Sequence, residues 1–263
     1  MKLAITGKGG VGKTTVSALL ARELAARGRQ VVAIDADPDS NLAAALGYPH
    51  PEAIRPLVEL HDLIEERTGV RPGTTGGMFQ LNPFVADIPE KYAVDVDGIK
   101  VLVAGAVKKG GAGCYCPENT LLRALVSHLL LESGAALVLD MEAGIEHLGR
   151  GTLRTVDRLL VVVEPGRRSV ETALRIQTMA SDIKLTKISI IGNKVRSADD
   201  EAFLKNLVPG IPFAGFVPYD DRVRDAEAAG RLVWGASEVV QEAIKKIVTE
   251  IEKSIEGQER PGK

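Results

Sequence analysis

The stretch Lys2-Leu3-Ala4-Ile5-Thr6-Gly7-Lys8-Gly9-Gly10-Val11-Gly12-Lys13-Thr14 decides the fold of this chain. Its first five residues are mostly apolar and predict a short strand, and Gly7 to Thr14 fits G-x-x-x-x-G-K-[ST]. A helical pattern follows directly, to about Arg27. A glycine-rich turn between strand and helix can point backbone N–H groups inward, and the helix N-terminus adds positive potential. We therefore predict a phosphate-binding loop that holds a nucleotide.

Each part of this loop has an expected role. Lys13 would reach the outer phosphates and act in catalysis, and the Thr14 hydroxyl would ligate Mg²⁺. ATP or ADP would be held by Gly9, Gly10, Val11, Gly12, Lys13, Thr14 and Thr15.

Composition limits the possible partners. Of the 263 residues, 45% are hydrophobic and 26% charged, as in an ordinary globular protein, and the net charge is only −2. No global basic field exists to attract nucleic acid or an acidic membrane. Apolar runs are shorter than a bilayer and the N-terminus lacks a signal-peptide pattern, so we expect a cytoplasmic protein without a membrane or nucleic-acid partner.

Apolar strand patterns alternate with helical patterns along the chain, which favours a parallel sheet. The expected fold class is α/β: a single P-loop NTPase domain over residues 1–263, with a mostly parallel central sheet, helices on both faces and a frayed tail at 256–263. A helix is expected over Leu57–Arg67, a loop over 72–89, and a hairpin turn at Asp97-Gly98. The main sheet strands are predicted at 31–34, 99–103, 136–139, 159–163, 187–192 and 213–217.

Acidic residues follow two of the predicted strands. Asp35, Asp37 and Asp39 come directly after residues 31–34, and Asp140 closes the strand at 136–139. Ligands bind outside the carboxyl ends of such strands, so these acids are expected beside the phosphate loop. We expect Asp35 and Asp140 to hold Mg²⁺ and Asp37 to act in catalysis, although which of the first three acids orients the attacking water is left open.

Cys114 and Cys116 are the two cysteines of the chain, which excludes a disulfide framework. They form a C-x-C motif just before a predicted helix, where the helix N-terminus favours thiolates. Two sulfurs cannot complete a tetrahedral site, but a two-fold dimer would supply four. We predict that the pair binds Ni²⁺ or Zn²⁺ across a homodimer.

The phosphate loop with its Lys8 resembles the deviant P-loop of the MinD, ParA and nitrogenase-iron-protein ATPases. Asp35-Ala36-Asp37-Pro38 is similar to their first switch, and Asp140-Met141-Glu142-Ala143-Gly144 to their second, D-x-x-A-G. The resemblance implies slow ATP hydrolysis by a homodimer that closes around two ATP molecules. It further implies that Lys8 contacts the partner's phosphates in catalysis, and that Asn193 and the backbone near Pro218 contact the adenine.

Within that group, Gly113-Cys114-Tyr115-Cys116-Pro117-Glu118-Asn119 resembles the C-x-C-P-E-N segment of the CooC-type nickel-insertion ATPases. The loop Glu164-Pro165-Gly166-Arg167-Arg168-Ser169 is similar to their E-P-G-R-R-S loop. The resemblance implies a maturation factor that couples ATP-driven dimerisation to nickel delivery, with carbon monoxide dehydrogenase as its client.

Two other functions within the group remain alternatives. A reductase like the nitrogenase iron protein would hold an Fe–S cluster on four cysteines, but this chain has Ala143 where that group uses a second-switch cysteine. A partitioning or positioning ATPase of the MinD or ParA type would need a basic or membrane-seeking terminal helix. Here the end of the chain carries Glu250, Glu252 and Glu256, which anionic lipid would repel.

Overall fold

The computed structural model describes residues 1–74, 80–105, 116–132, 134–143 and 155–259. In this part of the chain, strands form one eight-stranded sheet in the order β3-β4-β2-β5-β1-β6-β7-β8. All neighbouring strands run parallel except β3 and β4, which form an antiparallel hairpin around Asp97-Gly98. The strands are β1 (Lys2–Gly7), β2 (Val31–Ala36), β3 (Val94–Val96), β4 (Ile99–Val103), β5 (Ala136–Met141), β6 (Arg158–Val163), β7 (Ile188–Val195) and β8 (Phe213–Pro218).

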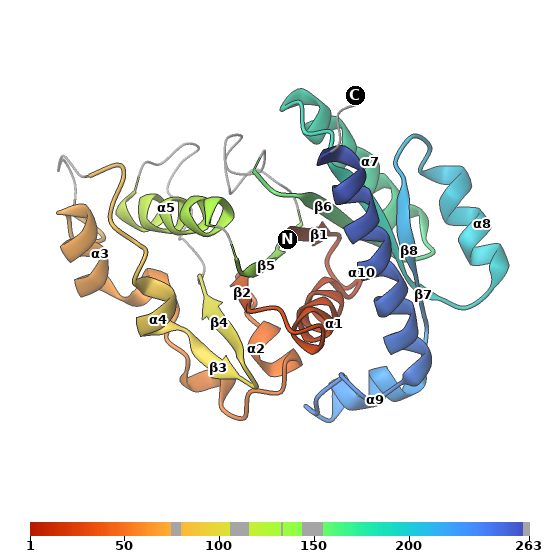
Figure 1. Ribbon diagram of the computed structural model, residues 1–263, viewed down its shortest axis with the longest axis horizontal. Helices are drawn as coiled ribbons and strands as arrows, with labels where there is room; N and C mark the ends of the chain where they lie inside the picture. Colours follow the sequence, from red (N-terminus) through yellow and green to blue (C-terminus); the bar gives the residue numbers. More distant parts are fainter. Residues whose placement is uncertain (75–79, 106–115, 133, 144–154, 260–263) are drawn as a thin grey trace.

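Helices cover both faces of this sheet (Figure 1). One face is covered by α1 (Lys13–Ala26), α2 (Leu42–Ala45), α9 (Asp221–Ala228) and α10 (Glu238–Glu259). The other face is covered by α3 (His61–Thr68), α4 (Ile88–Tyr92), α5 (Pro117–Leu131), α7 (Arg167–Asp182) and α8 (Ala198–Leu207). Two short 3₁₀ turns, η1 (Pro51–Ala53) and η2 (Leu57–Glu59), lie between α2 and α3.

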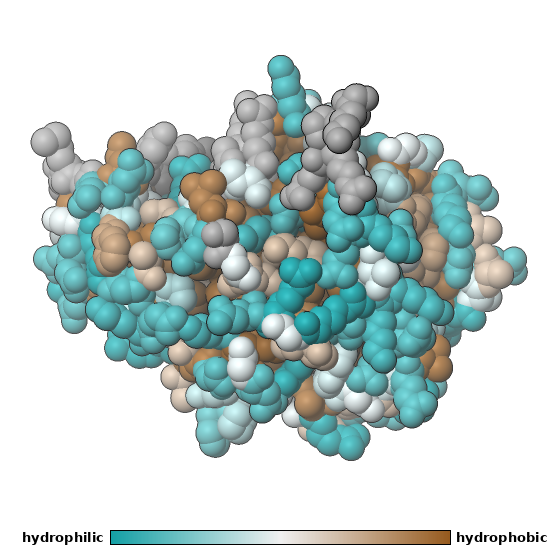
Figure 2. All heavy atoms as spheres, viewed as in Figure 1, coloured by the Kyte–Doolittle hydropathy of each residue, from teal (hydrophilic) through white to brown (hydrophobic). Residues whose placement is uncertain are grey.

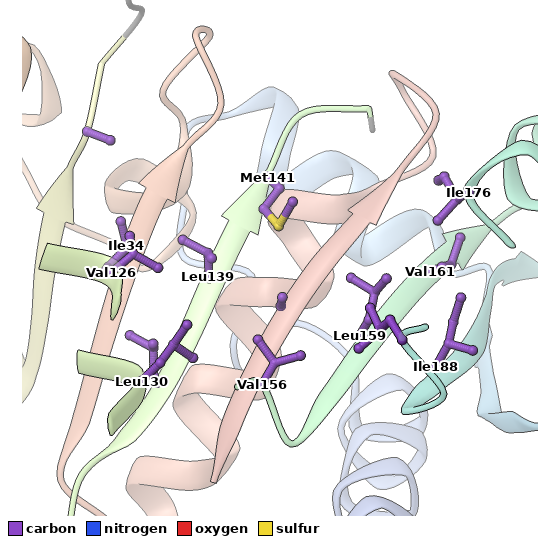
Figure 3. Packing of buried hydrophobic residues seen from close by; sticks show 14 of the residues in the cluster. Ile34, Val126, Leu130, Leu139, Met141, Val156, Leu159, Val161, Ile176 and Ile188 are labelled. Atoms are coloured by element: carbon purple, nitrogen blue, oxygen red, sulfur yellow. The ribbon is translucent and has the colours of Figure 1, made fainter. Parts of the chain in front are cut away.

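The core consists of two hydrophobic layers because side chains alternate across each buried strand. In β1, Leu3 and Ile5 face the α1 and α10 layer, whereas Ala4 faces the α5 and α7 layer. Figure 3 shows the second layer, in which residues of β2, β5, β6 and β7 meet Val126 of α5 and Ile176 of α7. Both faces of the central strands are thus sealed, and ligands can reach the sheet only at its ends.

The expected fold class is confirmed: a single α/β domain whose mostly parallel sheet has helices on both faces. Two local expectations were wrong. The helix expected over Leu57–Arg67 is split into η2 and α3, and α4 begins at Ile88, inside the expected 72–89 loop. Helix α10 continues to Glu259, so the first residues of the expected frayed tail, 256–259, are helical.

The terminal helix packs on the sheet. Val240, Ile244, Ile247 and Ile251 of α10 are almost fully buried against β8 and α1. The side of α10 that faces the viewer in Figure 2 is mostly hydrophilic. No helix of the described residues is long and apolar enough to span a bilayer. The apolar stripe of α10 is therefore part of the core, as its spacing predicts.

Candidate nucleotide-binding site

The glycine-rich loop lies where the sequence places it, between the end of β1 at Gly7 and the start of α1 at Lys13. Gly10 and Gly12 adopt left-handed φ values of 83° and 90°, which residues with a Cβ rarely adopt. Gly9 and Gly10 are exposed to solvent, whereas Val11 is fully buried and anchors the loop in the core. The half-buried Lys8 closes the turn by accepting a hydrogen bond from the Val11 N–H on its carbonyl.

Two consecutive residues of β7 hold this loop from one side. The Asn193 Nδ2 donates to the Val11 carbonyl at 2.8 Å, and the Lys194 Nζ donates to the Gly10 carbonyl at 2.6 Å. A Cβ on Gly12 would lie 2.4 Å from Asn193 Nδ2, so a larger residue at position 12 would have to displace this amide as well as adopt a left-handed φ. Because these donors engage both carbonyls, loop N–H groups other than that of Val11 can face an anion.

On the other side, the loop lysine pairs with the first switch. Lys13 Nζ lies 3.5 Å from Asp37 Oδ2, and both side chains are largely buried. The Asp37 Oδ1 accepts the Asp39 N–H at 3.1 Å, which makes a local turn, while Asp39 itself is exposed. The structure therefore brings Lys13 and Asp37 together but leaves Asp39 at the rim.

Asp140, at the end of β5, is fully buried beside the start of α1. Its Oδ1 accepts the Ser17 hydroxyl at 3.0 Å, and Thr14 also donates to the carboxylate. Its Oδ2 is buried without a hydrogen-bond partner. Burial raises the Asp140 pKa to about 6, although the hydrogen bonds from Thr14 and Ser17 oppose this rise.

Asp35 is the direct neighbour of Asp140 on the adjacent strand β2, and it too is fully buried. Its two oxygens accept the N–H groups of Asp37 and Leu42, at 3.1 and 2.8 Å. Burial raises the Asp35 pKa to about 7, assisted by the nearby Asp140 charge. Asp35 therefore shapes the first switch and caps α2, and its expected role as a magnesium ligand stays a prediction.

A cavity of about 490 Å³ opens beside these groups, within the usual size range for small-molecule sites. Its walls come from the glycine loop, the start of α1, the first switch, the end of β7 and the β8–α9 connection. Gly9, Gly10, Gly12, Lys13, Thr14, Thr15, Asp37, Asn193 and Pro218 all line it. The glycine loop, the adjoining cavity and Lys13 fit a nucleotide. The Asp140 oxygen that has no hydrogen-bond partner lies on a carboxylate that also accepts the Thr14 hydroxyl, and such oxygen ligands are the ones that Mg²⁺ prefers.

Sequence reasoning missed several residues of this cavity. Ser17, one helical turn beyond Thr14, shares its face of α1 and fixes Asp140, which i, i+3 spacing could have indicated. Thr15 donates its hydroxyl to Glu227 of α9, and Arg224 and Tyr219 line the same wall. These partners lie more than 200 residues from the loop in sequence, and no local pattern signals them.

The structure describes only half of the expected cysteine pair. Cys116 is half-buried at the N-cap of α5, and Cys114 lies outside the described residues. Ala104, just after β4, donates its N–H to the Asp35 carbonyl, so the chain leaves β4 at the same edge of the sheet as the first switch. Among the described residues, no cluster of three or more potential metal ligands is present.

The sequence was compared with known proteins. The CobQ/CobB/MinD/ParA nucleotide binding domain matches residues 2–233. The carbon monoxide dehydrogenase accessory protein CooC of Rhodospirillum rubrum is 47% identical over 88% of each chain. An uncharacterized ATP-binding protein of Methanocaldococcus jannaschii is 45% identical, over 94% of this chain and 96% of that protein.

Solved structures share the fold at lower identity. The MinD cell division protein of Aquifex aeolicus superposes with a TM-score of 0.67 at 20% identity, over 96% of each chain. A putative plasmid partition protein from Borrelia burgdorferi, bound to AMPPNP, gives 0.69 at 15% identity over 96% of this chain and 98% of that one. The family match, the close relatives and the geometry of the glycine loop agree with the resemblance found in the sequence: this chain belongs to the CobQ/CobB/MinD/ParA nucleotide-binding family.

Proposed function

We propose that this chain is an ATP-hydrolysing maturation factor that dimerises with ATP and helps insert nickel into carbon monoxide dehydrogenase. The observation that carries the proposal is the pairing of a complete nucleotide cavity with a cysteine at the start of α5, on a chain 47% identical to a carbon monoxide dehydrogenase accessory protein. Nickel is the cargo in this scheme, and ATP with Mg²⁺ drives its transfer.

The first step is nucleotide entry, for which the Lys13–Asp37 ion pair is the switch. Phosphate oxygens offer Lys13 a stronger anionic partner than one carboxylate, so they replace Asp37 as its counter-charge. The released Asp37 carboxylate then lies beside the phosphate site, where it can orient and deprotonate the attacking water. Nucleotide binding therefore also releases Asp37 for its role in hydrolysis.

Bound Mg²⁺ supplies neutralisation of the phosphate charge. Thr14 and Asp140 would hold the ion, because the buried Asp140 oxygen has no other partner. Ser17 keeps the carboxylate oriented through Oδ1, while Oδ2 is left without a hydrogen-bond partner. Asp35 supports this arrangement from β2 by fixing the backbone of the first switch.

Dimerisation would complete both halves of the site. The half-buried Lys8 lies next to the exposed Gly9 and Gly10, and from there it would reach the phosphates of a second copy. Cys116 begins the helix that follows β4, and the helix N-terminus favours its thiolate. With Cys114, two copies would provide four sulfurs, a donor set that suits Ni²⁺ or Zn²⁺.

Titration of the protein with Ni²⁺ and Zn²⁺ tests the metal part, followed by measurement of its molecular mass without nucleotide, with ADP and with ATP. We expect one metal ion per dimer and more dimer with ATP. Cys116→Ala should lose this metal while binding ADP normally. One tightly bound ion per monomer, or full nickel affinity in Cys116→Ala, would refute the shared site.

The hydrolytic part is tested by phosphate release from wild type and Lys8→Ala. We expect slow turnover that falls in the variant while ADP affinity in the monomer stays unchanged. Equal turnover in the two proteins would remove Lys8 from the mechanism.

The client is tested by adding the protein, ATP and Ni²⁺ to nickel-free carbon monoxide dehydrogenase. If the activity of the dehydrogenase does not rise above that with Ni²⁺ alone, this client is excluded.

A further inference from the structure

Two neighbouring side chains of β7 reach the same loop, which a regular strand would not allow. Consecutive residues of a strand point to opposite faces of the sheet, yet Asn193 and Lys194 donate to the adjacent carbonyls of Val11 and Gly10. The register of β7 against β8 explains how. Gly192 pairs with Phe216 and Val195 with Pro218, so two residues of β7 lie opposite one residue of β8.

This arrangement is a β-bulge, and its backbone is strained. Lys194 adopts a left-handed φ of 57°, although it is neither glycine nor asparagine. Bulges next to functional sites commonly redirect a side chain. Here the bulge turns Lys194 from the face opposite Asn193 toward the glycine loop, where its amine meets the Gly10 carbonyl at 2.6 Å.

A second contact, with Glu164, fixes the position of the Lys194 side chain. Glu164, directly after β6, places its Oε2 3.5 Å from Lys194 Nζ. The Glu164 backbone is held in turn, because its N–H donates to the Ser169 hydroxyl at 3.1 Å in the first turn of α7. Lys194 thus links the glycine loop to the end of β6, and it lines the nucleotide cavity itself.

We propose that Lys194, oriented by Glu164 and by the β7 bulge, is a positioning residue that holds the Gly10 carbonyl outward so that the loop's N–H groups face the phosphates. The cation acts on the loop at Gly10, one of its two exposed glycines, where the backbone has more conformational freedom than at a residue with a side chain. Its charge also adds to the positive potential of the cavity. The left-handed backbone at Lys194 is therefore tolerated, because the bulge in β7 keeps the nucleotide-free glycine loop in its binding conformation.

The proposal rests on nucleotide binding alone and requires neither hydrolysis, dimerisation nor the proposed nickel site. The test measures Mg²⁺-ADP affinity by calorimetry, together with the melting temperature of the nucleotide-free protein, for Lys194→Met, Lys194→Gly and Lys194→Arg. Loss of the charged hydrogen bond should weaken ADP binding about tenfold or more in the Met and Gly variants. Arginine, which keeps the charge and can reach the carbonyl, should restore most of that affinity.

Lys194→Gly separates positioning from simple stability. Glycine relieves the left-handed strain, so the nucleotide-free protein should melt higher than wild type while binding ADP more weakly. A purely structural lysine would give affinity and melting temperature that fall together, and that result would overturn the proposal. Wild-type ADP affinity in both Lys194→Met and Lys194→Gly would overturn it equally. Glu164→Gln should show a smaller loss of affinity, because the lysine keeps its contact with Gly10.

Discussion

The two sides of the nucleotide cavity are built differently. On the β7 side, Asn193 and Lys194 hold the glycine loop by neutral or cationic donors, and each of these contacts exists before nucleotide arrives. On the β2 and β5 side, Asp35 and Asp140 are buried carboxylates with raised pKa values, and one Asp140 oxygen has no partner. The first side is preformed, whereas under the proposed function a cation and phosphates would complete the second.

This difference separates two tasks. A preformed loop reduces the ordering cost of binding, because its backbone need not be fixed when the nucleotide arrives. Buried acids without a full set of partners destabilise the empty protein, and a bound cation removes that cost. Changes on the β7 side should therefore act on affinity, and changes on the β2 and β5 side should act on turnover and on the pH dependence of stability.

The largest effect is expected from Asp37→Ala. If Asp37 deprotonates the attacking water, phosphate release should fall about 100-fold, in the range usual for a general base. ADP affinity should stay the same or rise, because the carboxylate no longer competes for Lys13. Phosphate-release assays and calorimetry measure the two quantities separately.

Asp39→Ala is the matched control, since Asp39 lies in the same turn but is exposed at the rim. Its turnover should stay close to wild type. If the two variants lose turnover equally, the loop as a whole carries the effect, and Asp37 has no special role.

A smaller effect, on affinity, is expected from Gly12→Ala. Alanine would adopt a left-handed φ at a cost of about 1–2 kcal/mol and would press its Cβ against Asn193 Nδ2. Release of Asn193 from the Val11 carbonyl should follow, and ADP binding should weaken about 10- to 30-fold. Calorimetry of ADP binding measures this loss.

Gly9→Ala provides the comparison within the same loop. Gly9 has an ordinary φ, and a Cβ there would meet no atom within 4 Å. Near-normal ADP affinity is expected. If Gly9→Ala were as damaging as Gly12→Ala, general loop flexibility, and not the Asn193 contact, would explain the need for glycine.

The residues on the two sides of the cavity could not be predicted equally well from the sequence. The glycine loop, Asp37 and Asp140 follow from local patterns, because a motif or a strand end marks each of them. The hairpin at Asp97-Gly98 was predicted correctly for the same reason. Local turn chemistry and the apolar period of the strands therefore sufficed for the architecture.

The bulge in β7 was not predictable in this way. The apolar pattern indicates a strand that ends at Gly192, whereas the strand continues to Val195 and turns both Asn193 and Lys194 toward the loop. That geometry depends on pairing with β8 and on Glu164 at the end of β6, which are set by tertiary structure. Similarly, both oxygens of Asp35 are used by backbone N–H groups, a detail that the D-x-D-P pattern does not reveal.

The smallest effect is expected from Asp140→Asn, measured as the melting temperature of the nucleotide-free protein against pH. Burial raises the folded-state pKa of Asp140 to about 6, above its ordinary value. The folded protein then binds more protons than the unfolded chain between about pH 4 and 6, so this group's contribution to stability is lost as pH rises through that window. At pH 7.5 the wild type carries a buried charge that asparagine lacks.

Asp140→Asn should therefore melt above wild type at pH 7.5, by a few degrees for about 1–2 kcal/mol, and the difference should shrink toward pH 4. It should also lower the pKa of Asp35, which loses a like charge.

Asp220→Asn is the control and should shift the melting temperature in the opposite direction. Hydrogen bonds from Arg222 and Ser237 lower the Asp220 pKa, so its carboxylate stabilises the fold above pH 4 and its loss should lower the melting temperature at pH 7.5. If both variants shifted the melting temperature in the same direction at pH 7.5, the buried Asp140 carboxylate would not destabilise the nucleotide-free protein.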